Sequence, residues 1–411
     1  MSNKRNKILY ISYDGMTDPL GQSQVIPYLK GLADSGYSIH LLSFEKSERY
    51  AKGKSLIENS LQSSRIQWHP LSYTSKPPVI STLKDIWRMK KQARKLVRNQ
   101  QIDLVHCRSY ISALVGLQLK QRYGIKFIFD MRGFWADERV DGKIWNLENP
   151  LFRFIYSFFK RKEMQYLNEA DAIVSLTQNA ASEINTWKDF NGVSIDVIPC
   201  CADLNLFEAG SVNKRQKQQQ RELLGIPENA FVLSYLGSLG TWYMLDEMLD
   251  FFKVLLAYKP DAFFLFITAD QSDEIYRRAN EKGIATNSIV VKSAARNEVP
   301  LLASLSQLSV FFIRPSFSKK ASSPTKMGEL MAGGIPLVVN AGVGDVEQIM
   351  LDGGNGRVIR EFNEAEYHNV CRNLDSILSE NPERTVRCAH KWYSLKQGVD
   401  KYTAIYKRLL D

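Results

Sequence analysis

The chain of 411 residues holds only five cysteines and lacks long apolar runs. The cysteines are irregularly spaced, and the adjacent Cys200 and Cys201 do not have the C-x-x-C spacing of metal or redox sites, which argues against a disulfide framework. We therefore expect a reducing compartment. No run of about 18 apolar residues occurs, which argues against a membrane-spanning helix. Asp14 interrupts the apolar start of the chain, which favours a first strand over a signal peptide.

Several sequence fingerprints are also missing. The G-x-G-x-x-G and G-x-x-x-x-G-K-[ST] motifs do not occur in a usable context, which argues against a dinucleotide oxidoreductase and a P-loop phosphatase. The sequence has no D-x-D motif and no His/Cys cluster with the spacing of metal ligands. We expect no metal requirement and no cofactor.

Basic residues, in contrast, are concentrated in one part of the chain. The 54 Lys and Arg residues outnumber the 44 Asp and Glu residues, which gives a net charge of +10. Residues 1–200 contain 29 basic and 19 acidic side chains, whereas residues 201–411 contain 25 of each. Residues 51–100 alone contain 11 basic and 2 acidic side chains. The whole excess of positive charge therefore belongs to the first half, and it needs a partner or a structural reason.

One predicted helix, over residues 83–98, collects much of this charge. An apolar stripe lies roughly opposite five basic residues that follow one another at steps of four, three, four and three: Lys84, Arg88, Lys91, Lys95 and Arg98. This face is either the solvated side of a packed helix or an attachment to an anionic membrane surface, and both readings stay open. No recognised nucleic-acid module occurs, so we do not expect nucleic acid as a partner.

Apolar runs that predict strands alternate with predicted helices along most of the chain. This rhythm indicates βαβ units and parallel sheets in an α/β fold. The rhythm weakens after Ile198-Pro199, where the polar residues 208–222 predict a linker or an exposed loop, and it resumes near Phe231. We predict two Rossmann-like doubly wound domains facing a cleft, 1–203 and 204–391.

Ligands of open α/β sheets bind beyond the carboxyl ends of the strands, where loops enter helices. Candidate residues at or near such ends, in chain order, are Gly21, Gln22, His106, Asp130, Arg132, Gly237, Ser238, Thr268 and Arg314. A glycine directly after a strand lets the backbone approach a phosphate, and the following helix offers N–H donors. The plainer alternative for such a glycine loop is an ordinary strand-to-helix turn. The plainer alternative for His106 is a histidine buried in the core.

The stretch RPSFSKKASSPTKMGELMAGG, residues 314–334, carries the most information. Pro324 fits the first turn of a helix, with Ser322 or Ser323 as its cap. Thr325 and Lys326 would then lie in the first turn. The helix N-terminus, Lys326 and the nearby hydroxyls together predict an anion site.

Glu329 follows Lys326 by three residues, so the two side chains would be neighbours on this helix. Its carboxylate could accept hydrogen bonds from a sugar diol such as a ribose. A capped surface helix with one salt bridge is the plainer alternative.

These pieces, in this order, resemble a known family. The quoted segments are EADAIVSLTQNAASEI (169–184), VIPCCADLNLF (197–207), SYLGSLGTWY (234–243), KMGELMAGGIPLVVN (326–340) and WYSLKQGVDKYTAIYKRLL (392–410). The chain is similar nearly end to end to retaining GT-B glycosyltransferases of the type that assembles bacterial envelope polysaccharides. The resemblance implies a nucleotide-sugar donor held by the second domain, an acceptor held by the first, and a last helix, residues 392–411, that packs back on the first domain.

The resemblance also implies roles for single residues in the second domain. Glu329 matches the second glutamate of the family's E-x7-E motif, which binds the donor ribose, while Ala321 stands where the first glutamate should be. The family tends to grip the pyrophosphate with an Arg and a Lys after the strand that ends at Gly237, where this chain has other residues. Our hypothesis is that Arg314 and Lys326 supply that positive charge, with Gly237, Ser238, Thr268, Ser323 and Thr325 as further donor contacts.

In the first domain, Asp130 occupies the position of a family histidine near the reacting sugar. Asp130 could accept a sugar hydroxyl or stabilise positive charge, and Arg132 could orient it or reach a phosphate. Asp130, Arg132 and His106 are the candidate catalytic residues. Gly21 and Gln22 form the candidate acceptor loop. A purely structural pair of Asp130 and Arg132 is the alternative.

The expected function is transfer of a hexosyl or N-acetylhexosaminyl group from a UDP- or GDP-sugar to a glycan or a lipid-linked acceptor in envelope polysaccharide synthesis. A sugar-nucleotide epimerase or an inactive nucleotide-sugar-binding protein of the same fold is the alternative, and a nucleic-acid-binding protein a distant third. We expect a cytoplasmic protein. Peripheral attachment to the inner face of the cytoplasmic membrane stays open.

Overall fold

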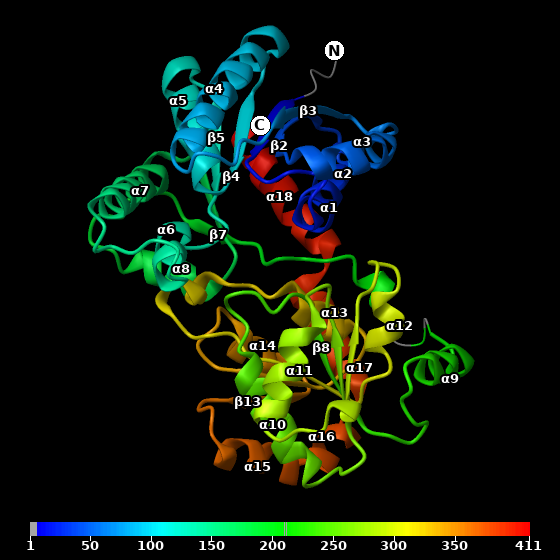
Figure 1. Ribbon diagram of the computed structural model, residues 1–411. Helices are drawn as coiled ribbons and strands as arrows, with labels where there is room; N and C mark the ends of the chain where they lie inside the picture. The colour runs from blue at the N-terminus through cyan, green and yellow to red at the C-terminus, as the bar shows by residue number, and fades with distance from the viewer. Residues whose placement is uncertain (1–5, 209, 211) are drawn as a thin grey trace. The chain divides into compact units, whose positions relative to one another are not determined.

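The computed structural model describes residues 6–208, 210 and 212–411 (Figure 1). The chain forms two compact units. Unit 1 consists of Met1–Cys200 together with Leu395–Asp411, and unit 2 consists of Cys201–Ser394. The last 17 residues therefore belong to the unit in which the chain begins, because helix α18 (Leu395–Leu410) lies beside α2 (Ile26–Asp34).

Unit 1 is built on a parallel sheet in the order β3-β2-β1-β4-β5-β6-β7. Its strands are β1 (Lys7–Ser12), β2 (Ser38–Glu45), β3 (Ile66–Ser72), β4 (Leu104–Arg108), β5 (Lys126–Asp130), β6 (Ala172–Ser175) and β7 (Ile195–Val197). The central strands are apolar runs buried on both faces, as expected for a parallel sheet covered by helices. The register places Arg108 of β4 beside Asp130 of β5, so the charged ends of two neighbouring strands meet.

Further helices of unit 1 connect these strands. They are α1 (Pro19–Gln24), α3 (Ser47–Leu61), α4 (Ile80–Gln100), α5 (Ser109–Tyr123), α6 (Trp135–Asp141), α7 (Pro150–Glu169) and α8 (Gln178–Asn185). Helix α4 buries Ile86, Met89, Ala93, Leu96 and Val97, which is the apolar stripe predicted from the sequence.

Unit 2 is built on a second parallel sheet, in the order β10-β9-β8-β11-β12-β13. Its strands are β8 (Val232–Leu236), β9 (Phe263–Ile267), β10 (Ile289–Lys292), β11 (Leu308–Phe311), β12 (Leu337–Asn340) and β13 (Gly356–Ile359). Its helices are α9 (Lys214–Leu223), α10 (Leu245–Leu256), α11 (Ser272–Glu281), α12 (Val299–Ala303), α13 (Thr325–Ala332), α14 (Val346–Gly353), α15 (Glu364–Arg372), α16 (Leu374–Ser379) and α17 (Pro382–Tyr393). Short 3-10 turns are η1 (Leu204–Phe207), η2 (Thr286–Ser288) and η3 (Phe317–Ala321).

The predicted fold class, two Rossmann-like α/β domains with parallel sheets, is confirmed. Two local expectations are wrong. The polar stretch 208–222 is not simply a loop, because Lys214–Leu223 forms α9, which begins at a capping box of Asn213 and Gln216. Ser322 and Ser323 do not occupy the capping position of α13, because the helix begins at Thr325 and Pro324 stands at its N-cap.

Helices α4 and α7 are the longest of the fold, but neither is apolar enough to cross a membrane. Within the described residues, no helix combines the length and the hydropathy of a membrane span.

Candidate functional site

The carboxyl ends of the strands in unit 2 bring the Gly237 turn and the start of α13 together. Gly237 directly follows β8 with a φ of 105°, in the left-handed region that favours glycine. A Cβ placed on Gly237 would stand 3.0 Å from the Lys326 Nζ. Glycine therefore allows the first turn of α13 to place a lysine directly against the backbone of this turn.

The Lys326 ammonium lies in an aromatic setting rather than beside a carboxylate. It is 3.6 Å from the ring centroid of Tyr243 and 4.3 Å from that of Tyr235, and it donates a hydrogen bond of 3.1 Å to the Tyr235 hydroxyl. Within the described residues, no carboxylate lies within ion-pair distance of it. Burial lowers the pKa of Lys326 well below its usual value, against the more distant charges of Glu329 and Asp270. An anion bound here would favour the charged form of the lysine.

Asp270 holds the residues that follow Gly237. Its carboxylate accepts hydrogen bonds from the Ser238 hydroxyl at 3.0 Å and from the backbone N–H of Leu239 at 2.5 Å. The backbone N–H of Asp270 in turn donates to the hydroxyl of Thr268 at 3.1 Å. The predicted contacts Ser238 and Thr268 therefore belong to one hydrogen-bonded turn, and Asp270 occupies the position that an anion would take at the Leu239 N–H.

Glu329 lies one turn of α13 beyond Lys326 and is almost fully buried. Its Oε1 is 2.7 Å from the guanidinium of Arg296, which also lies 5.0 Å from the ring centroid of Phe207. The sequence did not single out Arg296. The predicted Lys326–Glu329 salt bridge is not formed, since Glu329 pairs with Arg296 instead.

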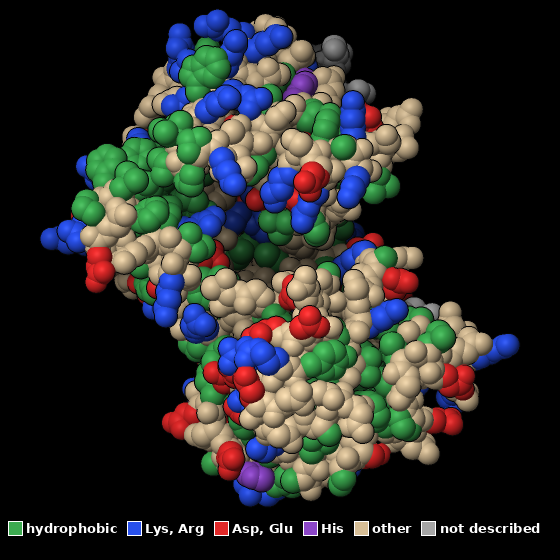
Figure 2. Space-filling view, in the orientation of Figure 1, with side chains coloured by type: hydrophobic (Ala, Val, Ile, Leu, Met, Phe, Trp, Pro, Cys, Tyr) green, Lys and Arg blue, Asp and Glu red, His purple; other side chains and the backbone are tan. Residues whose placement is uncertain are grey.

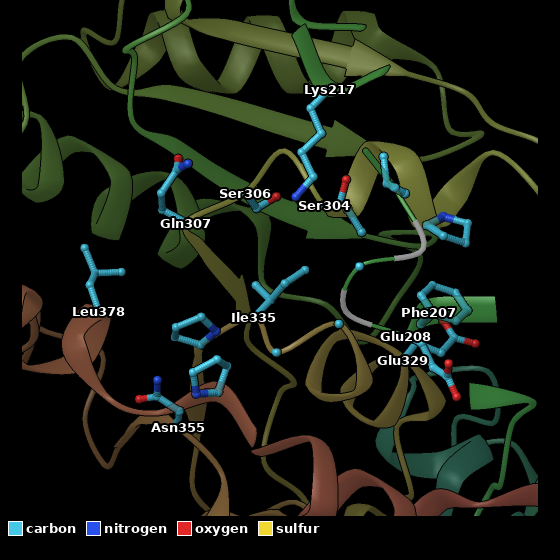
Figure 3. A pocket seen from close by; sticks show the side chains of 18 of the residues that line it. Phe207, Glu208, Lys217, Ser304, Ser306, Gln307, Glu329, Ile335, Asn355 and Leu378 are labelled. Carbon is cyan, nitrogen blue, oxygen red and sulfur yellow. The ribbon is translucent and has the colours of Figure 1, made fainter. Parts of the chain in front are cut away.

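A cavity of about 360 Å³ in unit 2 includes Glu329 at one end (Figure 3). Phe207 and Glu208 lie near Glu329, while Lys217 of α9 extends toward Ser304 and Ser306. Ser306, Gln307, Pro336 and Asn355 precede strands β11, β12 and β13, so most of the cavity opens at the amino ends of the strands. Of the predicted donor residues, Glu329 alone lines it.

The remaining predicted donor residues differ in exposure. The side chain of Arg314 is exposed, while its backbone N–H donates to the Trp242 carbonyl at 2.9 Å. Ser323 and Thr325 flank the N-cap of α13 and are half-buried. Lys319 of η3 is buried, and its ammonium lies 3.6 Å from the ring centroid of Trp242. Lys319 is a cation at this edge that sequence reasoning missed.

In unit 1, the structure brings the three candidate catalytic residues together. The His106 Nε2 lies 3.5 Å from the Asp130 Oδ2, and an Arg132 nitrogen lies 3.8 Å from the Asp130 Oδ1. His106 and Asp130 are each 1% exposed. Arg132 has a φ of 57°, a left-handed conformation that costs free energy in a residue with a Cβ.

Two tyrosines of α18 complete this buried group. The Tyr402 hydroxyl donates to the Asp130 Oδ2 at 3.0 Å, and the Tyr406 hydroxyl lies 2.8 Å from the His106 Nδ1. Burial lowers the pKa of His106, which keeps the imidazole neutral. Burial alone would raise the pKa of Asp130, but the positive charges of Arg132 and Arg108 lower it, so the pKa lies below its usual value and the carboxylate stays charged.

The predicted acceptor loop of unit 1 is part of α1. Gly21 is buried, and a Cβ on it would stand 2.2 Å from the Gly15 carbonyl oxygen, so close packing requires glycine there. Gln22 is exposed and donates to the Thr17 carbonyl at 3.3 Å. Glu45 holds the preceding loop by accepting hydrogen bonds from the backbone N–H groups of Met16 and Thr17.

The basic face of α4 is more varied than the sequence pattern predicts. Lys84, Lys91, Lys95 and Arg98 are exposed, but Arg88 is half-buried and bonds the Ser72 carbonyl and Asp85. A shallow basin of about 430 Å³ on this face is lined by Trp87, Lys90, Lys91, Arg94, Lys95, Arg98, Asn99 and Arg122. Figure 2 shows Lys and Arg side chains gathered around apolar groups over α4.

Among the residues that the structure describes, no three His, Cys, Asp or Glu side chains are grouped as metal ligands.

Comparison with known proteins gives two family matches that together cover most of the chain. Residues 23–206 match the family described as Glycosyltransferase Family 4, and residues 216–391 match Glycosyl transferases group 1. A D-inositol 3-phosphate glycosyltransferase of Catenulispora acidiphila is 24% identical over 282 residues, which span 66% of this chain and 62% of that protein. The match therefore covers less than two thirds of this relative's length.

Solved structures share the fold at low identity. Sucrose-phosphate synthase from Thermosynechococcus elongatus aligns with a TM-score of 0.73 at 14% identity, over 98% of this chain and 99% of that chain. The HepE protein of Anabaena, solved in complex with UDP-glucose, aligns with a TM-score of 0.69 at 14% identity, over 98% and 100% of the two chains. The two family matches confirm the coarser part of the expectation: the chain belongs to the GT-B glycosyltransferase superfamily.

Proposed function

We propose that the chain is a retaining glycosyltransferase that moves a sugar from a UDP- or GDP-sugar to a glycan or lipid-linked acceptor in cell-envelope polysaccharide synthesis. The observation that carries the proposal is Lys326, a desolvated ammonium held against the backbone of the Gly237 turn. Glycosyltransfer from a nucleotide sugar releases a diphosphate, and a cation in the first turn of a helix is suited to receive it.

The donor diphosphate would bind between the Gly237 turn and the first turn of α13. There its oxygens would accept from the Lys326 ammonium, from the backbone N–H groups that begin α13, and from the Leu239 N–H after displacing the Asp270 carboxylate. Arg314, exposed at the same sheet edge, adds a second positive charge. The HepE complex with UDP-glucose supports this class of ligand.

The ribose of the donor would be held by Glu329. In the structure this carboxylate pairs with Arg296 at 2.7 Å rather than with Lys326. A ribose diol would take the remaining acceptor capacity of the carboxylate. Ala321 leaves Glu329 as the single carboxylate of the E-x7-E pair.

Rate acceleration would come from stabilising the leaving diphosphate rather than from a protein nucleophile. Lys326 and the N–H groups at the start of α13 stay fixed while negative charge develops on the leaving group, and such preorganised donors stabilise a transition state more than the ground state. Asp130 and Arg132 would act from unit 1 through the Asp130 carboxylate, whose charge is maintained by Arg132.

Attachment to an anionic membrane surface forms part of the proposal. Lys90, Lys91, Arg94, Lys95, Arg98 and Arg122 crowd around one basin, and within the described residues none has a carboxylate within ion-pair distance. Burial, Arg94 and Lys162 lower the pKa of Lys90, so positive charges oppose one another here. The neighbouring Ile80, Leu83 and Trp87 are 64%, 61% and 62% exposed, at helical spacing. Cations beside exposed apolar groups suit lipid phosphates above acyl chains.

A panel of UDP-, GDP- and ADP-sugars tests the reaction. With one donor we expect release of the nucleoside diphosphate, by slow hydrolysis or by transfer to an added glycan, and NMR of the product should show the anomeric configuration of the donor. Interconversion of the sugar without release of the diphosphate would instead identify an epimerase, and salt-sensitive binding of oligonucleotides alone would overturn the proposal.

A further inference from the structure

Beneath the carboxyl ends of β4 and β5, unit 1 contains a small polar chamber. Its walls come from β1, β4, β5, α2 and α18, and its polar lining includes His106, Arg108, Asp130 and Arg132. The centre of a water molecule has about 10 Å³ of room in it. That is about the room that one water needs.

Four buried atoms of ionisable side chains on this lining make no hydrogen bond within the described residues. They are the His106 Nε2, the Arg108 Nη1, the Asp130 Oδ1 and the Arg132 Nε. The four side chains are between 1% and 8% exposed, so bulk water does not reach them. Each buried polar group left without a partner costs about 1–3 kcal/mol, and so many around one space call for a shared partner.

The four atoms divide into two donors and two acceptors. The guanidinium nitrogens of Arg108 and Arg132 only donate, and the Asp130 carboxylate oxygen only accepts. The neutral His106 ring has its Nδ1 at 2.8 Å from the Tyr406 hydroxyl, and its Nε2 makes no bond to Asp130 despite their distance of 3.5 Å. If the Nδ1 carries the proton and donates it to the Tyr406 hydroxyl, the Nε2 is unprotonated and is the second acceptor.

We propose that this chamber binds a single water molecule, which accepts from Arg108 and Arg132 and donates to Asp130 and His106. A water offers two acceptor and two donor positions, which is the complement of these four atoms. A halide cannot donate to the Asp130 carboxylate, and a metal cation would face two guanidinium groups. The water site shares His106, Asp130 and Arg132 with the candidate catalytic group, but the tests below do not depend on the proposed transfer reaction.

The bound water gives α18 a defined task. Tyr402 lines the chamber and fixes the Asp130 Oδ2 by a hydrogen bond, and Tyr406 fixes the His106 Nδ1 in the same way. The water then fixes the opposite atoms of the same two side chains. Tyr402 and Tyr406 are thus positioning residues that, with the water, hold the charged strand ends of unit 1 in one arrangement.

A high-resolution crystal structure of the full chain, grown in bromide salt, tests the site. We expect one spherical density peak in the chamber, within hydrogen-bond distance of all four atoms and without anomalous signal. An anomalous peak would identify a halide and overturn the proposal, as would an empty chamber in which the four side chains have re-paired.

The tautomer of His106 gives a second readout on the unaltered protein. Nitrogen-15 NMR should show a neutral ring with the proton on Nδ1 and a bare Nε2. A proton on Nε2 would remove the acceptor and overturn the proposed geometry. As a variant test, Arg108→Met should lose one long-lived water by oxygen-17 relaxation dispersion, and the exposed Arg98→Met should lose none. An unchanged count in folded Arg108→Met would contradict the site.

Discussion

The Lys326 Nζ lies 3.0 Å from the point at which a Cβ on Gly237 would stand. The two residues belong to separate β-α connections of unit 2, yet each determines what the other position tolerates. Gly237 needs both its left-handed φ and its missing side chain, and Lys326 needs that empty space to bring its ammonium against the turn. This relationship is the structural basis of the proposed donor site.

Removing the Lys326 ammonium is expected to weaken nucleotide binding without unfolding unit 2. Because a hydrogen bond to a charged group is worth about 1.5–3 kcal/mol, Lys326→Ala should raise the dissociation constant for the donor about 10- to 150-fold. Calorimetric titration measures the effect. The exposed Lys253 of α10 is the matched control, and Lys253→Ala should bind as the unaltered protein does.

Arg314 is expected to contribute in the same direction. Since its side chain is exposed and screened, Arg314→Ala should weaken nucleotide binding less than Lys326→Ala does. The same titration measures it. If the affinities of both variants equalled that of the unaltered protein, neither residue would contact the diphosphate.

Charge reversal on α4 is expected to release the protein from anionic vesicles. Each basic group near such a surface contributes about 1 kcal/mol, so Lys91→Glu with Lys95→Glu should lower binding to phosphatidylglycerol vesicles roughly 30-fold or more. Flotation at several salt concentrations measures it. Lys52→Glu with Lys54→Glu on α3 makes the same change of net charge elsewhere on unit 1. Equal losses in the two pairs would show that net charge alone governs binding.

The histidine pair of β2 and β3 is expected to make unit 1 sensitive to acid. The His40 Nδ1 lies 3.1 Å from the His69 Nε2, and burial, His69 and Lys7 lower the pKa of His40 from 6.5 to about 4. Between these values the unfolded chain binds a proton that the folded chain does not, so stability is lost as the pH falls from 6.5 toward 4. The loss is on the order of 3 kcal/mol.

Denaturant unfolding across this pH range checks the expectation. His40→Gln should reduce the pH dependence of the free energy of unfolding. His368 is a half-buried histidine of unit 2, and His368→Gln should leave this pH dependence unchanged. The same slope in His40→Gln and in the unaltered protein would assign the acid sensitivity to other groups.

Removing the Tyr402 hydroxyl is expected to destabilise unit 1 through Asp130. The buried carboxylate would lose a donor at 3.0 Å, so Tyr402→Phe should cost about 1–3 kcal/mol in the free energy of unfolding. Thermal and denaturant unfolding measure it. Tyr258→Phe removes a half-exposed hydroxyl that bonds His368 at 3.0 Å, and should change stability by no more than about 0.5 kcal/mol. Equal effects would mean that Asp130 does not depend on this bond.

The sequence predicts the buried elements well, because continuous apolar runs have few alternatives. The apolar runs at 7–12, 126–130, 263–267 and 337–340 predict strands, and the pattern at 245–256 predicts a helix. The structure forms β1, β5, β9, β12 and α10 with these bounds. Helix α9 was missed because it lacks an apolar stripe. It depends instead on its capping box and on Arg221, whose guanidinium donates to the carbonyls of Ala230 and Leu305.

At the candidate sites, residue types at strand ends could be read from the sequence, but their pairing could not. Lys326 and Glu329 have the i, i+3 spacing of a salt bridge, yet Glu329 pairs with Arg296, which comes from the connection after β10. Asp270 stands three residues beyond β9, and its role could not be predicted because its hydrogen bonds exist only when the Gly237 turn lies beside it. Likewise, only the fold brings Tyr402 to Asp130.

Nucleotide-induced thermal stabilisation of the unaltered protein and of Lys326→Ala tests the donor site most directly. We expect UDP or GDP to raise the melting temperature of the unaltered protein and of Lys253→Ala, and we expect this shift to be lost in Lys326→Ala. Stabilisation of Lys326→Ala equal to that of the unaltered protein, or no stabilisation of the unaltered protein by any nucleoside diphosphate, would contradict it.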